Sequence, residues 1–286
     1  MQLIINAPCS YFRLMDNFTG LIEFIPGLIW SLYYSWQRQN YSLEFRQIFV
    51  TLCVCLWSLR LGGFLIYRML IIGPLDTRID NLRRKYGQLG VLGFWCGPHG
   101  FWSFICCLPV TLLHTLPLIE GKSNISDWIG ITIWLCGFIM ETWADRNKLQ
   151  AKLVREGKYY HLGVLWNYCR NPNHCGEVFC WLGLSIIGFN LFFHQSSYQY
   201  NLCIFVLLLI GPLFTLSAML FEATLTSEIK NNQRFGHQLD YLQYRKQTSI
   251  LWPIPSIFYL RLPSWIRKIC FFEFNLYSEG LKKQIE

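Results

Sequence analysis

The sequence predicts an all-α membrane protein, a polytopic helical bundle of about six transmembrane helices with both termini in the cytoplasm. Three observations predict this fold class: a composition poor in charge, a series of long apolar segments, and an alternation of cationic and nearly uncharged loops. Of the 286 residues, 53% are hydrophobic and only 15% are charged. A soluble domain carries about 25% charged residues, so we expect part of this chain to face lipid.

Six apolar segments follow one another along the chain. A spanning helix needs about 20 mostly apolar residues, and helix is preferred because lipid cannot satisfy the exposed backbone groups of an open sheet. A buried soluble core is the alternative, but six such segments in a chain of this length argue against it. The N-terminus shows no removable signal peptide. The predicted spans are residues 18–36, 47–72, 101–119, 128–144, 178–193 and 200–221.

The cationic residues lie in alternate loops. Lysine and arginine are frequent after the second, fourth and sixth spans and sparse after the first, third and fifth. Cationic loops remain on the cytoplasmic side, so the three large polar segments and both termini are expected there. The net charge of +8 is then explained by cations that orient the protein in the membrane, assisted by anionic lipid headgroups. No nucleic-acid partner is needed to explain it. The membrane is a bacterial inner membrane or the endoplasmic reticulum. No linker or repeat divides the chain, so we expect one domain over residues 1–286.

The cysteines give no indication of a metal site or a disulfide framework. Most of the 12 lie inside apolar spans, where a cysteine behaves as a small hydrophobe. Cys169, His174, Cys175 and Cys180 are close in sequence, but metal-binding spacings such as C-x2-C are missing. We therefore predict no metal.

The fourth span ends in a helix face that carries Asp145, Lys148 and Lys152, at positions i, i+3 and i+7. One interpretation is a solvated helix end whose cationic side chains reach the interface. The other is a face that holds a phosphate or a ribose. Glu141, one turn earlier, lies inside an apolar run, where a carboxylate is costly unless it faces a polar cavity.

Residues 166–181 read WNYCRNPNHCGEVFCW and start the fifth span. Asn171 followed by Pro172 predicts a helix start, with asparagine as the N-cap and proline in the first turn. Asn173 and Glu177 then lie four residues apart on one face. Capping explains the first two residues but not Glu177.

The same stretch contains the groups that a nicotinamide nucleotide requires. A helix N-terminus favours anions, and Arg170 can clamp a phosphate or carboxylate. Trp166 and Tyr168 offer flat surfaces for a ring, while Asn173 and Glu177 can bond a carboxamide. The alternative is a well-capped membrane helix with an aromatic interface belt.

The stretch resembles the signature of the steroid 5-alpha-reductase-like membrane proteins. Within that group, this chain resembles the branch of unknown function more than the characterised steroid reductases. Three further blocks resemble family segments: WSLRLGGFLIYR at 57–68, WADRNKLQAK at 143–152, and a tail with the Y-x-x-Y-x-x-x-T-S-x-x-x-P pattern. The signature region runs from 141 to 260. Asn171 and His174 depart from the usual histidine and tyrosine. The residues that match the first signature are Trp166, Tyr168, Arg170, Pro172, Asn173, Gly176, Glu177 and Trp181.

The resemblance implies an NADPH-dependent reduction of a carbon–carbon double bond in a lipid or sterol-like substrate within the membrane. It implies that Asn173 and Glu177 hold the nicotinamide carboxamide. It also implies a set of residues that binds the ribose and phosphates, with two residues of the tail covering the site. Similar enzymes polarise the substrate carbonyl with a glutamate–tyrosine pair, for which Glu23 and Tyr67 are the candidates here. The implied set is Asp145, Lys148, Lys152, Tyr168 and Arg170, with Tyr241 and Arg245 from the tail.

Two alternatives remain open. The isoprenylcysteine and phospholipid methyltransferases have a similar signature and use S-adenosylmethionine, although the pair of Asn173 and Glu177 favours the reductases. A non-catalytic lipid-binding membrane protein is the other. The partners expected in every case are a lipid or sterol-like molecule and membrane lipids.

Overall fold

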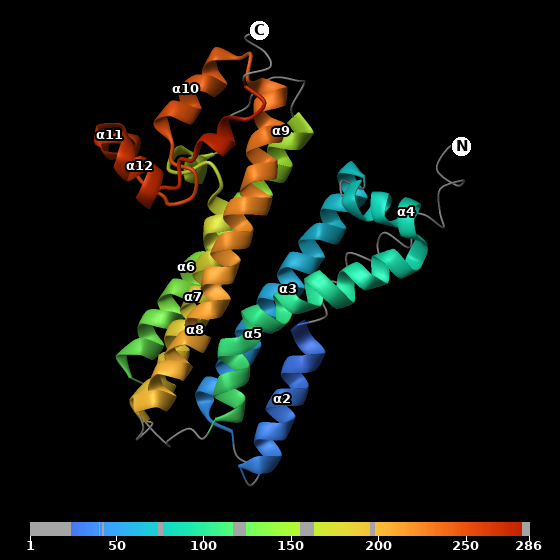
Figure 1. Cartoon of the computed structure of the whole chain (residues 1–286), viewed down its shortest axis with the longest axis vertical. Helices are drawn as coiled ribbons and strands as arrows, with labels where there is room; N and C mark the ends of the chain where they lie inside the picture. Colours follow the sequence, from blue (N-terminus) through green and yellow to red (C-terminus); the bar gives the residue numbers. More distant parts are fainter. Residues whose placement is uncertain are drawn as a thin grey trace. The chain divides into compact units, whose positions relative to one another are not determined.

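The computed structural model describes residues 24–39, 41, 43–73, 77–116, 124–154, 163–194 and 198–281, and its regular elements are helices (Figure 1). Short π or 3-10 segments join several of them, including η1 (Trp95–His99), η2 (Val164–Asn167), η3 (Phe189–His194), η4 (Met219–Thr224) and η5 (Asn275–Ser278). The α-helices are α2 (Phe24–Arg38), α3 (Phe45–Ile72), α4 (Thr77–Phe94), α5 (Gly100–Thr115), α6 (Ile125–Val154), α7 (Pro172–Gly188), α8 (Tyr198–Ala218), α9 (Leu225–Phe235), α10 (Leu239–Gln247), α11 (Ser256–Arg261) and α12 (Ser264–Cys270).

The chain forms two compact units. The first, unit 1, comprises Met1–Trp128 with Leu184–Gly211, and the second, unit 2, comprises Ile129–Gly183 with Pro212–Glu286. The expectation of one domain over residues 1–286 stays a prediction, because compactness does not decide whether either unit folds alone.

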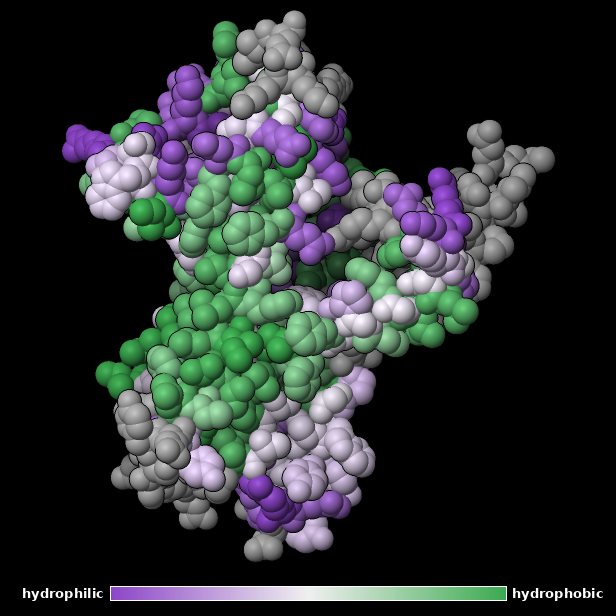
Figure 2. All heavy atoms as spheres, in the orientation of Figure 1, coloured by the Kyte–Doolittle hydropathy of each residue, from purple (hydrophilic) through white to green (hydrophobic). Residues whose placement is uncertain are grey.

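Among the described residues, five helical runs are long and apolar enough to cross a membrane. This confirms an all-α, polytopic, integral multi-pass membrane protein. Figure 2 shows hydrophobic residues covering the middle of α6 and α8, with hydrophilic residues over the tail helices. The sidedness of the termini stays a prediction. The five runs are Phe45–Ile72, Asn81–Thr115, Ile125–Val154, Pro172–Leu191 and Tyr200–Phe235.

The predicted spans and the observed helices differ mainly at their ends. The first predicted span starts in residues outside the described part of the chain, and its remainder is α2, with 15 residues, shorter than the roughly 20 that cross a bilayer. Four of the five runs begin or end well outside the predicted limits, because backbone hydrogen bonds continue a helix into polar sequence. The run Asn81–Thr115 begins 20 residues before the predicted start at residue 101 and so extends into a segment predicted to be a cationic loop. The run Ile125–Val154 ends 10 residues after the predicted end at residue 144. The run from Tyr200 thus reaches Phe235, and its polar end is α9.

Unit 1 is held by aromatic and polar contacts between α2, α3 and α5. Phe24 packs edge-on against Trp57 and Trp102, with ring centroids 5.5 and 5.2 Å apart. The buried imidazole of His114 bonds Ser31 Oγ at 2.7 Å through Nδ1 and Thr51 Oγ1 at 2.9 Å through Nε2. One histidine therefore joins three helices, which satisfies its polar atoms inside an apolar unit.

A second polar contact in unit 1 joins α3 to the start of α6. Arg46 Nη2 donates to Asp127 Oδ2 at 2.9 Å and Arg46 Nε donates to both carboxylate oxygens at 3.0 Å. Asn190 Nδ2 also donates to Asp127 Oδ1. Both charges are buried, so each depends on the other for its compensation.

In unit 2, α6 and α7 approach each other at glycines. A Cβ atom on Gly176 would lie 2.6 Å from the carbonyl oxygen of Gly137, and one on Gly183 would lie 2.6 Å from that of Gly130. The two contacts are seven residues apart on both helices and in opposite order, so the helices are antiparallel here. Small residues let membrane helices pack at the backbone, and this packing places the first turns of α7 against the middle of α6.

Candidate functional site

The chain that leads into α7 is paired with the tail. Cys169 and Ser249 form a parallel bridge, and Arg170 N donates to Ser249 O at 2.8 Å. Tyr168 O accepts from Ile254 N and from Ser249 Oγ, both at 3.2 Å. The backbone therefore joins two segments that resemble family blocks and lie about 80 residues apart.

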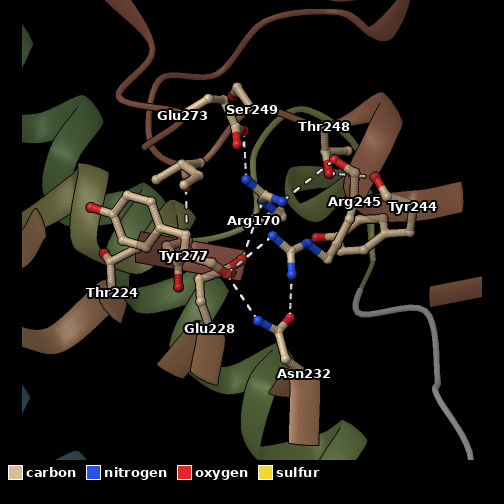
Figure 3. Close-up of polar contacts among 12 residues, drawn as sticks. Arg170, Thr224, Glu228, Asn232, Tyr244, Arg245, Thr248, Ser249, Glu273 and Tyr277 are labelled. Carbon is tan, nitrogen blue, oxygen red and sulfur yellow. Dashed lines mark hydrogen bonds and ion pairs between the residues drawn. The ribbon is translucent and has the colours of Figure 1, made fainter. Parts of the chain in front are cut away.

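The side chain of Arg170 is the centre of a buried ionic network (Figure 3). Its Nη2 donates to Glu273 Oε1, and its Nε lies 3.6 Å from Glu228 Oε2. Glu228 is 2% exposed, and its Oε1 accepts from Asn171 Nδ2 at 3.3 Å. Burial alone would lower the pKa of Arg170, but the carboxylates of Glu228 and Glu273 raise it above its ordinary value. The guanidinium is therefore a permanent cation with two carboxylate partners from the protein.

Asn232 of α9 links this network to the tail. Its Oδ1 accepts from Tyr241 Oη at 2.8 Å and from Arg245 Nη1, and its Nδ2 donates to Tyr277 O at 2.9 Å. Arg245 Nη2 also donates to Tyr277 O at 3.1 Å. Burial, followed by the charge of Glu228, raises the pKa of Tyr241 above its ordinary value, so its hydroxyl remains a donor.

Arg170, Tyr241 and Arg245, which the resemblance placed at a cofactor, thus lie together. Each bonds protein groups in the structure, and a direct contact with a cofactor stays a prediction for all three. Sequence reasoning missed Glu228, Asn232 and Glu273. The spacing of Glu228, Asn232 and Phe235 could have indicated the buried face of α9. The three residues lie at i, i+4 and i+7, which places them on one helix face, and they are the buried residues of this helix.

The helix α7 starts where the sequence predicts, and the side chain of Asn171 donates to partners outside this helix. The helix begins at Pro172, and Asn171 O accepts from Cys175 N at 3.2 Å, as the carbonyl of an N-cap residue does. The Asn171 amide donates instead to Glu228 and to Ile250 O. His174, the other departure from the family pattern, bonds Thr224 Oγ1 at 2.8 Å through Nδ1. Both unusual residues therefore bind polar groups of the segment 224–250.

Asn173 and Glu177 lie one helical turn apart on α7, and both are half-buried. The Oδ1 atom of Asn173 is buried and accepts no hydrogen bond within the described part of the chain. A buried carbonyl oxygen without a donor is unusual in a folded protein and costs about 1–3 kcal/mol. The first turns of α7 therefore present an acceptor that a ligand donor could satisfy.

The predicted residues of α6 differ in their surroundings. Asp145 is buried, Lys148 is half-buried and Lys152 is exposed. Lys148 Nζ lies 5.8 Å from the ring centroid of Trp166, a cation–π distance. Trp166 is 3% exposed, and its indole Nε1 donates no hydrogen bond to a described residue. Lys148 therefore lies beside the signature segment, whereas Lys152 faces solvent.

The remaining candidates lie at the surface or outside the described residues. Tyr168 is 39% exposed and contributes its backbone carbonyl to the pairing with the tail. Tyr67 on α3 is 56% exposed. Glu23 lies outside the described residues, so the structure does not test a pair of Glu23 and Tyr67. In the described ranges, no cluster of three histidine, cysteine or acidic side chains is arranged to hold a metal ion.

Comparison with known proteins identifies one family. The model of a family described as "Protein of unknown function (DUF1295)" matches residues 12–248. Searches of curated proteins and of solved structures found no significant match.

Proposed function

This chain belongs to the family of membrane proteins described as Protein of unknown function (DUF1295), and from that premise we propose that it is an NADPH-dependent reductase. The proposed reaction reduces a carbon–carbon double bond of a lipid or sterol-like substrate within the membrane. The resemblance of four sequence blocks to the steroid 5-alpha-reductase-like proteins supports this proposal. Under this proposal the chain is an oxidoreductase with NADPH as its cofactor.

The observation that carries the proposal is the buried Oδ1 of Asn173, which accepts no hydrogen bond from a described residue, beside the half-buried Glu177. A nicotinamide carboxamide has an NH2 group with two donors. Asn173 Oδ1 and the Glu177 carboxylate supply acceptors one helical turn apart. The residues present therefore fit the nicotinamide end of the cofactor.

In this proposal the cations that bind the phosphates belong to α6. We assign this role to Lys148, which lies beside Trp166, and to Lys152, one turn further along. Arg170 is less suited to bind a phosphate directly, because Glu228 and Glu273 already compensate its charge. In this proposal Arg170, Tyr241 and Arg245 hold the tail against the signature segment and fix the wall of the site.

NADPH supplies the hydride in such a reaction. The chain would bind and orient the nicotinamide through Asn173 and Glu177, and would exclude water by packing α7 against α6. Asp145 would hold the ribose from the buried face of α6. A protein acid would then protonate the product, and Glu23 and Tyr67 stay the candidates for the pair that polarises the substrate carbonyl.

The test is nucleotide binding by the full-length chain purified in mild detergent. NADPH should bind more tightly than NADH, and the preference should shrink as salt screens exposed cations. Asn173→Ala removes the proposed acceptor and should weaken NADPH binding roughly tenfold. Asn167→Ala, a change at an exposed asparagine in η2, is the matched control and should bind as the wild type does.

The same preparation distinguishes the alternatives. Binding of S-adenosylmethionine without NADPH would indicate the methyltransferase class. Retention of lipid with no affinity for either nucleotide would indicate a lipid-binding protein. Equal NADPH affinity in the Asn173→Ala and Asn167→Ala variants would show that the nicotinamide does not bind at α7.

A further inference from the structure

The two short tail helices α11 and α12 are held against membrane-spanning helices at both of their ends. Before α11, the ring of Trp252 stacks on Phe179 of α7 with centroids 5.8 Å apart. After α12, Phe272 contacts Trp252, and Phe274 stacks on Phe221 at 6.3 Å. Phe179 and Phe221 both belong to runs that can cross the bilayer. The segment between Trp252 and Phe272 is therefore fixed close to the membrane.

This segment exposes large apolar side chains, although it belongs to the polar tail. Five such side chains are between 51% and 67% exposed. Apolar side chains interspersed with cations are typical of helices that lie in a membrane interface. Arg261, Arg267 and Lys268 are the cations of α11 and α12. The five apolar residues are Ile257, Phe258, Leu260, Trp265 and Ile269.

A cationic cavity of about 330 Å³ lies between α10, α12 and the chain after them. Figure 1 shows α10, α11 and α12 together at one end of α6. Five cations line the cavity against one carboxylate, a balance that suits an anion. The volume lies within the range of small-molecule sites. The charged lining residues are Arg170, Arg245, Lys246, Arg267, Lys268 and Glu273.

Three of these cations remain available for a ligand. Glu273, the carboxylate of the lining, accepts from both Arg170 and Tyr259. Within the described residues, Lys246, Arg267 and Lys268 form no ion pair, and Arg267 lies over the ring of Tyr259 at 5.8 Å. Ser264 also lines the cavity.

We propose that α11 and α12 form an interfacial anchor and that the adjoining cavity binds the phosphate of an anionic phospholipid headgroup. Lys246, Arg267 and Lys268 would surround the phosphate, while Trp265 and Ile269 on α12 would enter the acyl boundary. A lipid is favoured over a soluble phosphate because the apolar side chains lie on the same short helix as two of the cations. The proposal goes beyond the reductase function and does not depend on it.

The experiment uses the full-length chain in detergent, equilibrated with equimolar phosphatidylglycerol and phosphatidylcholine. Native mass spectrometry measures the ratio of the two lipids that remain bound. The wild type should retain phosphatidylglycerol in preference, and this arm requires no variant. Lys268→Gln should lower the ratio roughly fivefold, the effect of one cation near an anionic surface. Lys268→Arg keeps the charge and should retain the preference.

Two comparisons separate the cavity from general surface charge and from soluble phosphates. Lys230→Gln removes an exposed cation of α9 that neither lines the cavity nor belongs to α11 or α12, and it should leave the lipid ratio unchanged. Inorganic phosphate or NADPH at the lipid concentration should not displace phosphatidylglycerol. The proposal is overturned by equal retention of the two lipids in the wild type, by an equal effect of Lys230→Gln and Lys268→Gln, or by displacement with either soluble phosphate.

Discussion

Gly137 on α6 and Gly176 on α7 contact each other backbone to backbone, so closely that a Cβ atom on Gly176 would lie 2.6 Å from the Gly137 oxygen. The same Cβ atom would lie 2.8 Å from the Cβ atom of Glu141. The contact is part of the arrangement that places Asn173 and Glu177 at the proposed site. Glycine is required at this position by lack of space and not by backbone conformation.

We expect Gly176→Ala to separate α6 from α7 and to lower the free energy of unfolding by about 1–3 kcal/mol, the cost of overpacking. Gly63→Ala is the matched control, because a Cβ atom on Gly63 of α3 has nothing within 4 Å. That change should be neutral or slightly stabilising. Thermal unfolding of both variants in detergent measures the difference. Similar melting temperatures for the two variants would contradict the close contact.

Glu228→Gln should destabilise the chain by about 3 kcal/mol, because it leaves the buried Arg170 with one carboxylate in place of two. Glu273→Gln should cost less, about 1–2 kcal/mol, since the Glu273 side chain is 23% exposed against 2% for Glu228. Both changes preserve the side-chain shape. Chemical or thermal unfolding of the two variants tests the order, and a larger loss for Glu273→Gln would show that Glu228 is not the main partner.

The tail should lose stability in alkali. Burial, followed by the charge of Glu228, raises the pKa of Tyr277 from 10.0 to about 12, and its hydroxyl donates to Leu220 O at 2.9 Å. The folded state thus keeps a proton that the unfolded state releases near pH 10. The stabilisation is complete below that pH and is lost as the pH rises towards about 12.

The measurement is the melting temperature as a function of pH above neutrality, for the wild type and for Tyr277→Phe. The variant should start less stable and should decline less steeply above pH 10. Tyr86→Phe, at an exposed tyrosine of α4, should follow the wild-type curve. Identical slopes for wild type and Tyr277→Phe would exclude this phenol as the titrating group.

Glu177→Gln tests whether the Glu177 carboxylate accepts a hydrogen bond from the nicotinamide carboxamide. It keeps the volume but replaces one acceptor oxygen with an NH2 donor, which should cost about 1.5–3 kcal/mol of NADPH binding, roughly tenfold or more in affinity. A purely structural carboxylate near the helix start would change stability by about 0.3–1 kcal/mol and leave binding alone. NADPH affinity and melting temperature are measured together. Glu222→Gln, an exposed glutamate in η4, is the control.

The fold was predictable where apolar length alone decides it. The spans in α3, α5, α6, α7 and α8 follow from composition, because a bilayer requires long apolar helices. The continuation into α9 did not follow, since charged residues such as Lys230 indicate a polar tail. The burial of Glu228 depends on Arg170, which lies far away in sequence.

The candidate site was predictable only in part, for a related reason. The helix start at Pro172 is a local signal, and the structure confirms it. The partners of Asn171 and His174 are not local, since Glu228 and Thr224 belong to the next spanning run. The two departures from the family pattern therefore gained an interpretation only from the structure.

The Arg170 network also constrains the order of events at the ribosome. Glu273 is translated 103 residues after Arg170, which takes about 5–20 s at ordinary elongation rates. During that interval the arginine has left the ribosome while its second carboxylate does not yet exist. The start of α7 can therefore enter the membrane early, but the network around Arg170 is completed only when nearly the whole chain has been synthesised. A premature stop before Glu273 would release a chain whose spans are present and whose central cation is half-compensated, which is a substrate for membrane quality control.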